Sequence, residues 1–178
     1  MSSVDVLTLP GYGGSGLLHW QTRWEVSSPN LARVEQREWE RPVRHEWVAA
    51  IETAVRRAGP NVVLAAHSLA CLAVAHWACG PHSPIKGALL VAVPDPTGSN
   101  FPPSTVGFGT TPLTRLSFPS IVVISSDDPY SSPQFAEDHA AAWGSRVVHI
   151  GPKGHINGDS GLGMWDEGRK LLESLIAG

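Results

Sequence analysis

The sequence has few charged residues and no concentration of positive charge. Lysine, arginine, aspartate and glutamate make up 16% of the 178 residues, and the formal net charge is -3. Proteins that bind nucleic acids or anionic membrane surfaces usually carry clustered lysine and arginine, because these side chains attract phosphate groups. The lack of such a cluster argues against nucleic acid and against a membrane surface as partners.

Long apolar runs are also missing. No stretch approaches the roughly 20 consecutive apolar residues that span a bilayer, and residues 1–10 lack the basic and apolar segments of a signal peptide. We therefore expect a cytoplasmic protein.

Cysteine is scarce, with Cys71 and Cys79 alone. If both lie on one helix, their spacing corresponds to about 12 Å, which is too long for a disulfide. No second pair of thiols and no histidine at ligand spacing accompanies them, so we expect no metal site. We interpret both as small buried apolar side chains.

The composition that remains is that of a globular protein. Hydrophobic residues make up 42% of the chain, and seven tryptophans predict large buried aromatic contacts. The length falls in the range of about 100 to 200 residues that is typical of one domain. We expect residues 1–178 to form a single domain.

Short apolar runs rich in β-branched residues alternate with helical patterns. Six runs predict strands: Val4–Leu9, Leu31–Arg37, Asn61–Ala66, Lys86–Val93, Pro119–Ser125 and Ser145–Ile150. The third to fifth runs are nearly continuous in apolar residues, which is typical of central strands covered on both faces. The alternation predicts an α/β fold, a three-layer α/β/α sandwich around a mostly parallel six-stranded sheet.

Three segments carry clear helical patterns. Apolar residues recur at helical spacing from Trp47 to Ala58, and Gly59-Pro60 ends that pattern. The segment from Leu69 to Ala78 is apolar all round, which indicates a helix buried against the sheet. A last helix with one apolar face is expected from Trp165 to Ile176.

Ser68 lies between the third predicted strand and the apolar helix, with Ala66 two residues before it and Ala70 two residues after it. A very tight strand-to-helix turn requires small residues at these positions, because larger side chains would collide. Such a turn exposes the serine hydroxyl as a nucleophile. The usual pattern has glycine at both positions, and a serine there is often only a helix cap, so other parts of the chain must support this interpretation.

A serine nucleophile needs a base, and imidazole is suited to that role near pH 7. Among the eight histidines, His155 stands in a Gly-Pro-Lys-Gly-His loop after the last predicted strand. Open α/β folds place their sites at the carboxyl ends of the strands. His155 is therefore the predicted general base.

The base in turn needs a carboxylate that holds its tautomer, and the expected chain order is serine, acid, histidine. Two adjacent aspartates follow the fifth predicted strand in the segment Ser-Ser-Asp-Asp-Pro-Tyr. We predict Asp128 as the acid and interpret Asp127 as a solvated neighbour or a helix cap. Asp127, and Asp95 after the fourth predicted strand, are the alternatives.

Attack on a carbonyl creates an oxyanion, which preorganised N–H donors must stabilise. We predict the backbone amides of Leu69 and Tyr12 for this oxyanion hole. The glycine-rich segment around Tyr12 could instead bind phosphate, but no Gly-Lys-Ser/Thr follows it and its glycine spacing does not fit a dinucleotide loop.

Taken together, these motifs resemble the small serine hydrolases of the retinoblastoma-binding-protein-nine type, in particular their bacterial members, within the α/β-hydrolase superfamily. The resemblance rests on Pro10-Gly-Tyr-Gly-Gly-Ser-Gly, His19-Trp-Gln, Ala66-His-Ser-Leu-Ala, Ser125-Ser-Asp-Asp-Pro-Tyr and Gly154-His-Ile-Asn. It implies a minimal α/β-hydrolase fold without the first strands of larger members. It also implies a triad of Ser68, Asp128 and His155 and esterase activity on small esters.

The expected reaction is a two-step acyl transfer to water on a small ester-like substrate, with no cofactor. Thioesterase and peptidase activity share this apparatus and stay open, and a protein-binding module on a hydrolase scaffold is the alternative from another class. The irregular segment from Pro94 to Phe118, together with His19, Trp20 and Tyr130, is expected to form the rim of an apolar acyl pocket.

Overall fold

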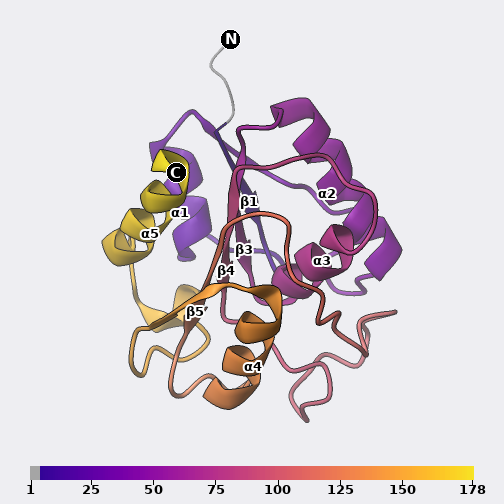
Figure 1. Ribbon diagram of the computed structural model, residues 1–178. Coiled ribbons are helices and arrows are strands. Elements are labelled where there is room, and N and C mark those ends of the chain that lie inside the picture. The colour runs from indigo at the N-terminus through magenta and orange to yellow at the C-terminus, as the bar shows by residue number, and fades with distance from the viewer. Residues whose placement is uncertain (1–4) are drawn as a thin grey trace.

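The computed structural model describes residues 5–178, which form an open sheet with helices on both faces (Figure 1). The strands are β1 (Val6–Leu9), β2 (Leu31–Arg33), β3 (Val63–His67), β4 (Gly87–Val91), β5 (Ser120–Ile124) and β6 (Arg146–His149). They pair in the order β2-β1-β3-β4-β5-β6, and all the pairings are parallel. The predicted α/β sandwich with a six-stranded sheet is confirmed. Val4, at the start of the first predicted strand, lies outside the described residues.

Five α-helices are present among residues 5–178: α1 (Trp20–Ser27), α2 (Arg44–Ala58), α3 (Leu69–Ala78), α4 (Pro133–Trp143) and α5 (Asp166–Ala177). Helices α1 and α5 pack on one face of the sheet, and α2, α3 and α4 pack on the other (Figure 1). In the same described residues, no helix combines the length and the apolar character that a bilayer span requires.

Two of these helices are absent from the sequence prediction. Helix α1 lacks a clean apolar stripe, because its buried residues include Gln21 between two tryptophans, and this side chain donates to the carbonyl oxygens of Leu9 and Ala65. Helix α4 does carry a start signal, since Ser132 caps its first turn and Pro133 occupies the first helical position.

Strand β2 is shorter than predicted and ends at Arg33 rather than Arg37. It lies at the edge of the sheet and pairs with β1 alone. After Val34, whose amide donates to the carbonyl oxygen of Thr8 at 2.9 Å, the chain leaves the sheet. An edge strand has a neighbour on one side only, so its length depends on that single partner.

Aliphatic side chains and tryptophans pack on both faces of the sheet. The core on the side of α2, α3 and α4 contains Trp47, Trp77 and Trp143, and Trp20, Trp24 and Trp165 form a cluster on the side of α1 and α5. The ring centroid of Trp20 lies 4.5 Å from that of Trp24 and 5.1 Å from that of Trp165. Of the two free cysteines, Cys71 is buried as expected, but Cys79 is exposed because it lies just past the end of α3.

Candidate active site

Ser68 occupies the turn from β3 into α3 in a strained backbone conformation, with φ 55° and ψ -125°. A positive φ at a residue other than glycine costs about 1–3 kcal/mol, so the surrounding structure must impose it. Two hydrogen bonds do so: the Ser68 amide donates to the carbonyl oxygen of Val91 at 2.9 Å, and its carbonyl oxygen accepts from the Cys71 amide at 2.8 Å. The turn is thus held by the neighbouring strand and by the helix it starts.

The loop after β1 packs directly against this turn. A Cβ atom placed on Gly11 would lie 2.9 Å from the Cβ of Ser68 and 2.9 Å from the carbonyl oxygen of His67. Real side chains essentially never approach so closely, so position 11 requires glycine. The close approach brings the following residue, Tyr12, to the wall of the cavity at Ser68.

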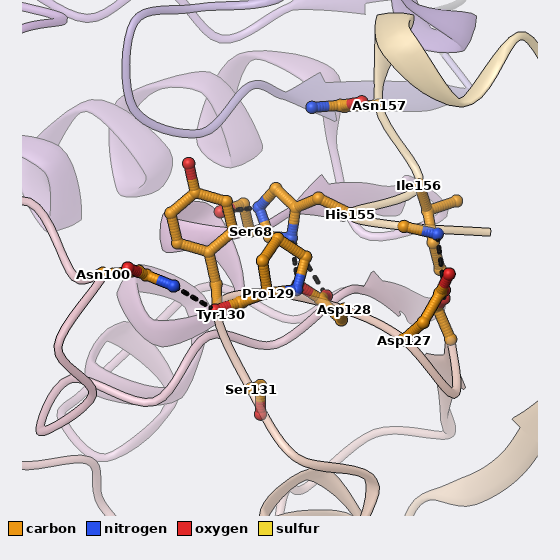
Figure 2. Close-up of polar contacts among 12 residues, drawn as sticks. Ser68, Asn100, Asp127, Asp128, Pro129, Tyr130, Ser131, His155, Ile156 and Asn157 are labelled. Carbon is orange, nitrogen blue, oxygen red and sulfur yellow. Dashed lines mark hydrogen bonds and ion pairs between the residues drawn. The ribbon is translucent and has the colours of Figure 1, made fainter. Parts of the chain in front are cut away.

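The structure brings Ser68, His155 and Asp128 into one hydrogen-bonded series (Figure 2). His155 Nε2 lies 2.7 Å from Ser68 Oγ, and His155 Nδ1 lies 2.8 and 2.9 Å from the two carboxylate oxygens of Asp128. The side chains of His155 and Asp128 are only 9% and 4% exposed. With the Nδ1 proton donated to the carboxylate, Nε2 is the free acceptor that can take the serine proton.

Asp127 and Asp95, the alternative acids, have other partners. The carboxylate of Asp127 accepts hydrogen bonds from the Gly154 amide at 2.7 Å and from the Ser125 hydroxyl at 2.9 Å, and these bonds lower its pKa. Asp127 is exposed, as expected of a solvated neighbour, and its hydrogen bond to the Gly154 amide also anchors the loop that carries His155. Asp95 accepts from the amide and hydroxyl of Thr97 within its own turn.

Two further histidines lie at the site: His19, which was expected at the rim of the pocket, and His67, which was not predicted there. The ring centroid of His67 is 4.6 Å from that of His19 and 4.9 Å from that of His155. Burial lowers the pKa of His67 well below its usual value and, with Arg33 and His155 nearby, lowers the pKa of His19 to about 3. Both rings are therefore neutral near pH 7.

His67 ties the predicted base to the serine turn. Its Nε2 group lies 2.8 Å from the carbonyl oxygen of His155 and donates to it. Because His67 directly precedes Ser68 in the chain, this bond holds the backbone of His155 next to the turn that carries Ser68. The one sequence feature that could have indicated this role is the position of His67 directly before Ser68. The nucleophile motif allows any residue there, so the motif alone does not predict a histidine contact.

The amides of Tyr12 and Leu69, predicted as oxyanion donors, lie in residues that line the same cavity as Ser68. Leu69 begins α3, and amides in the first turn of a helix have no acceptor within the helix. In the Tyr12 loop the neighbouring amides are engaged, since Gly13 donates to the carbonyl oxygen of Trp39 and Gly14 to that of Gly11. This geometry is compatible with the predicted roles.

A cavity of about 140 Å³ lies over Ser68. The irregular segment contributes Pro94, Phe101 and Pro102 to its walls, and His19 and Tyr130 line it as expected. Trp20 does not: its ring is 1% exposed, and its Nε1 group donates inward to the carbonyl oxygen of Ile156 at 2.9 Å. Throughout residues 5–178, no group of three or more metal-binding side chains is arranged to hold an ion.

A family model described as serine hydrolase matches residues 6–174. The fold is similar to that of a YdeN-like hydrolase from Pectobacterium atrosepticum, at 32% identity and a TM-score of 0.86 over 97% of this chain and 90% of that chain. It is also similar to the ydeN gene product of B. subtilis, at 19% identity and a TM-score of 0.79 over 98% and 99% of the two chains. A thermophilic esterase from Thermogutta terrifontis shares the fold at 14% identity and a TM-score of 0.70, over 98% of this chain and 90% of that chain. No curated protein sequence matches the chain.

Proposed function

The chain belongs to the serine hydrolase family, and from that premise we propose that it hydrolyses small carboxylic esters through an acyl-enzyme on Ser68. One observation carries the proposal: the hydrogen-bonded series from Asp128 through His155 to Ser68, which ends on a strained serine turn at a cavity. We further propose that it is a bacterial member of the retinoblastoma-binding-protein-nine type. The motifs around Ser68, Asp128 and His155 support that assignment.

In the first step, Ser68 Oγ attacks the ester carbonyl carbon while His155 Nε2 takes the hydroxyl proton. Asp128 stabilises the imidazolium that forms, and the amides of Leu69 and Tyr12 donate to the oxyanion. The intermediate collapses when the bond from the carbonyl carbon to the leaving oxygen breaks. His155 gives its proton to that oxygen, and the alcohol departs.

In the second step, water replaces the alcohol. His155 Nε2 removes a proton from the water as its oxygen attacks the acyl carbon, and the bond to Ser68 Oγ then breaks with return of the proton to the serine. The products are a carboxylic acid and free enzyme. No redox change occurs, so these residues need no co-reactant other than water.

Replacement of the nucleophile tests the proposal. Ser68→Ala should lower kcat for 4-nitrophenyl acetate by about six orders of magnitude. A fluorophosphonate probe should label the parent protein and leave Ser68→Ala unlabelled. Ser126→Ala is the matched control, because Ser126 is an exposed serine on a loop at the same edge of the sheet.

Two outcomes would count against the proposal. Unchanged hydrolysis by purified Ser68→Ala would exclude Ser68 as the nucleophile. A folded parent protein that neither reacts with the probe nor hydrolyses the ester would favour the protein-binding alternative. If the protein is active, its rates on a butanoyl ester, a butanoyl thioester and a butanoyl amide at equal concentration show which leaving group it prefers.

A further inference from the structure

Three hollows meet at the site, and they differ in form. The cavity over Ser68, with its volume of about 140 Å³, is the most enclosed of them. An open groove of about 310 Å³ runs from it past Leu17 and Leu18, and a second open groove of about 460 Å³ runs past Lys153 and Ser160. Asn157 lines all three hollows.

The enclosed cavity limits the size of what it holds. An apolar cavity of about 150 Å³ accommodates one benzene molecule, that is, about six carbon atoms. The reacting ester group must occupy part of this space. About two to four carbons therefore remain for the acyl group, counted with its carbonyl carbon.

The far wall of the cavity is fastened in place. Phe101 and Pro102 form it, and residues on both sides of them are hydrogen-bonded to other loops. Asn100 donates to the carbonyl oxygen of Pro129 at 2.7 Å, a bond drawn in Figure 2. Ser104 donates to the carbonyl oxygen of Glu40 at 2.7 Å and accepts from the Tyr12 hydroxyl at 3.1 Å. A longer acyl chain would have to displace this wall.

The position of His155 assigns the other half of the ester to the open grooves. His155 Nε2 must protonate the leaving oxygen, so the alcohol lies on the His155 side of Ser68. His155 lines both the cavity and the larger groove, whereas Ser68 and Leu69 line the cavity and not that groove. The acyl group then points the other way, towards Leu69 and Phe101 in the enclosed cavity.

Asn157 offers hydrogen-bond donors where the grooves leave the cavity. Its side-chain oxygen accepts from the Asp159 amide at 3.0 Å, which identifies the other end of the amide as the NH₂ group. Within the described part of the chain, no hydrogen bond engages that NH₂ group, and the residue is partly exposed. Lys153, Asp159 and Ser160 also line the larger groove, together with two prolines.

We infer that the protein removes acyl groups of about two to four carbons from bulky, hydroxyl-rich alcohols of the sugar or polyol class, with the NH₂ group of Asn157 donating to an oxygen of the alcohol. This inference rests on the proposed ester hydrolysis and names its substrate class. The enclosed cavity sets the acyl length, and the polar groove and Asn157 select the alcohol.

The acyl side is tested with 4-nitrophenyl acetate, butanoate and octanoate. We expect kcat/KM to fall at least about tenfold from butanoate to octanoate, the scale of a poor fit in an apolar pocket. Equal values, or a preference for octanoate, would overturn the acyl-length part of the inference.

The alcohol side is tested with three acetates followed by acid release: methyl 6-O-acetylglucoside, hexyl acetate and ethyl acetate. The first two have bulky alcohols and differ in polarity, so bulk and hydroxyl content are separated. We expect the glucoside to have the highest kcat/KM of the three, with a lower KM than hexyl acetate. A preference for hexyl acetate would instead indicate an apolar alcohol along Leu17 and Leu18 and would overturn the assignment.

Asn157→Ser tests the donor itself. Serine keeps an oxygen that can cap the turn at Gly158–Ser160 but removes the NH₂ group. The ratio of kcat/KM for the acetylglucoside to that for hexyl acetate should fall about three- to tenfold, the usual worth of one hydrogen bond. A purely structural role would lower both values together and leave the ratio unchanged. Ser126→Ala should keep the parental ratio.

Failure of the proposed ester hydrolysis and failure of the proposed substrate class give different results. If ester hydrolysis is wrong, the parent protein gives no fluorophosphonate labelling and cleaves none of the acetates. If only the substrate class is wrong, the parent protein is labelled and active but prefers octanoate or hexyl acetate, or Asn157→Ser keeps the parental ratio.

Discussion

The cavity over Ser68 has walls from two regions that are held in different ways. The side chains proposed to react are Ser68, Asp128 and His155, which lie on the turn after β3 and on the loops after β5 and β6 and are hydrogen-bonded in series. The opposite wall, Phe101 and Pro102, belongs to an irregular segment fastened by hydrogen bonds at exposed positions. Hydrogen bonds at exposed positions compete with water, so each one contributes little to stability.

Because the two walls are held differently, the rate of the reaction and the choice of ester should depend on different residues. Substitutions at the strand ends should change the rate of the chemical step, whereas substitutions in the irregular segment should change which ester is accepted. Four substitutions test whether rate and ester selectivity are separate in this way, and they are given in order of decreasing expected effect.

The largest effect is expected at the strand ends, from Asp128→Asn. An amide in place of the carboxylate favours the wrong His155 tautomer, so kcat for 4-nitrophenyl acetate should fall about 10⁴-fold. Asp127→Asn should have a much smaller effect, because this carboxylate anchors the loop and does not contact the ring. Steady-state kinetics on both variants measures the difference; equal losses would mean that the adjacent aspartates share one role.

Gly11→Ala should misplace the serine turn without removing any reacting group. The new Cβ would lie 2.9 Å from the Cβ of Ser68, and a displacement of about 1 Å can cost about 10²-fold in rate. Gly16→Ala is the matched control in the same loop, since no heavy atom lies within 4 Å of its added Cβ. If both variants keep parental kcat, the close packing of this loop does not govern the chemistry.

The site should also be sensitive to acid through His19, which caps α1 and lines the cavity. His19 has a pKa of about 3 in the folded protein and about 6.5 when unfolded, so below pH 6.5 the unfolded chain binds a proton that the folded one does not. Stability is therefore lost as pH falls, by about 2 kcal/mol at pH 5 from this residue, or about 30-fold in the folding equilibrium.

His19→Asn isolates that contribution, because asparagine can still accept from the Gln21 amide as a helix cap but does not titrate. Urea denaturation at pH 7.5 and pH 5 should show a smaller loss of unfolding free energy for the variant than for the parent. Parallel losses would show that burial of His19 does not set the acid sensitivity.

The smallest effect is expected from the irregular segment. Phe101→Ala should enlarge the cavity and raise the ratio of kcat/KM for 4-nitrophenyl octanoate to that for the acetate about tenfold, since a pocket discriminates methylenes on that scale. Leu113→Ala, at a position 60% exposed in the same segment, should leave the ratio unchanged. A general loss of kcat in Phe101→Ala with an unchanged ratio would contradict the separation of rate from selectivity.

Some features of the site had no strong local signal. Asn157 and His67 gain their roles from neighbours distant in the chain, since His67 bonds to residue 155 and Asn157 faces hollows lined by four separate loops. Trp20 was expected at the rim together with His19, but the helix that begins at this residue turns its ring into the tryptophan cluster. Adjacent residues on a helix point in different directions, so proximity in sequence did not decide the contact.

Patterns in the sequence were enough to predict the six strands, the position of Ser68 between β3 and α3, and the position of His155 in the loop after the last strand. These features depend on periodicity and on residues a few positions apart, which a chain carries in any context. Tertiary structure was needed to show that Asp128, and not Asp127, hydrogen-bonds to His155, that position 11 requires glycine, and that the histidines at 19 and 67 are buried and neutral. Those outcomes depend on distances of a few ångströms between loops, and strand pairing and packing set these distances.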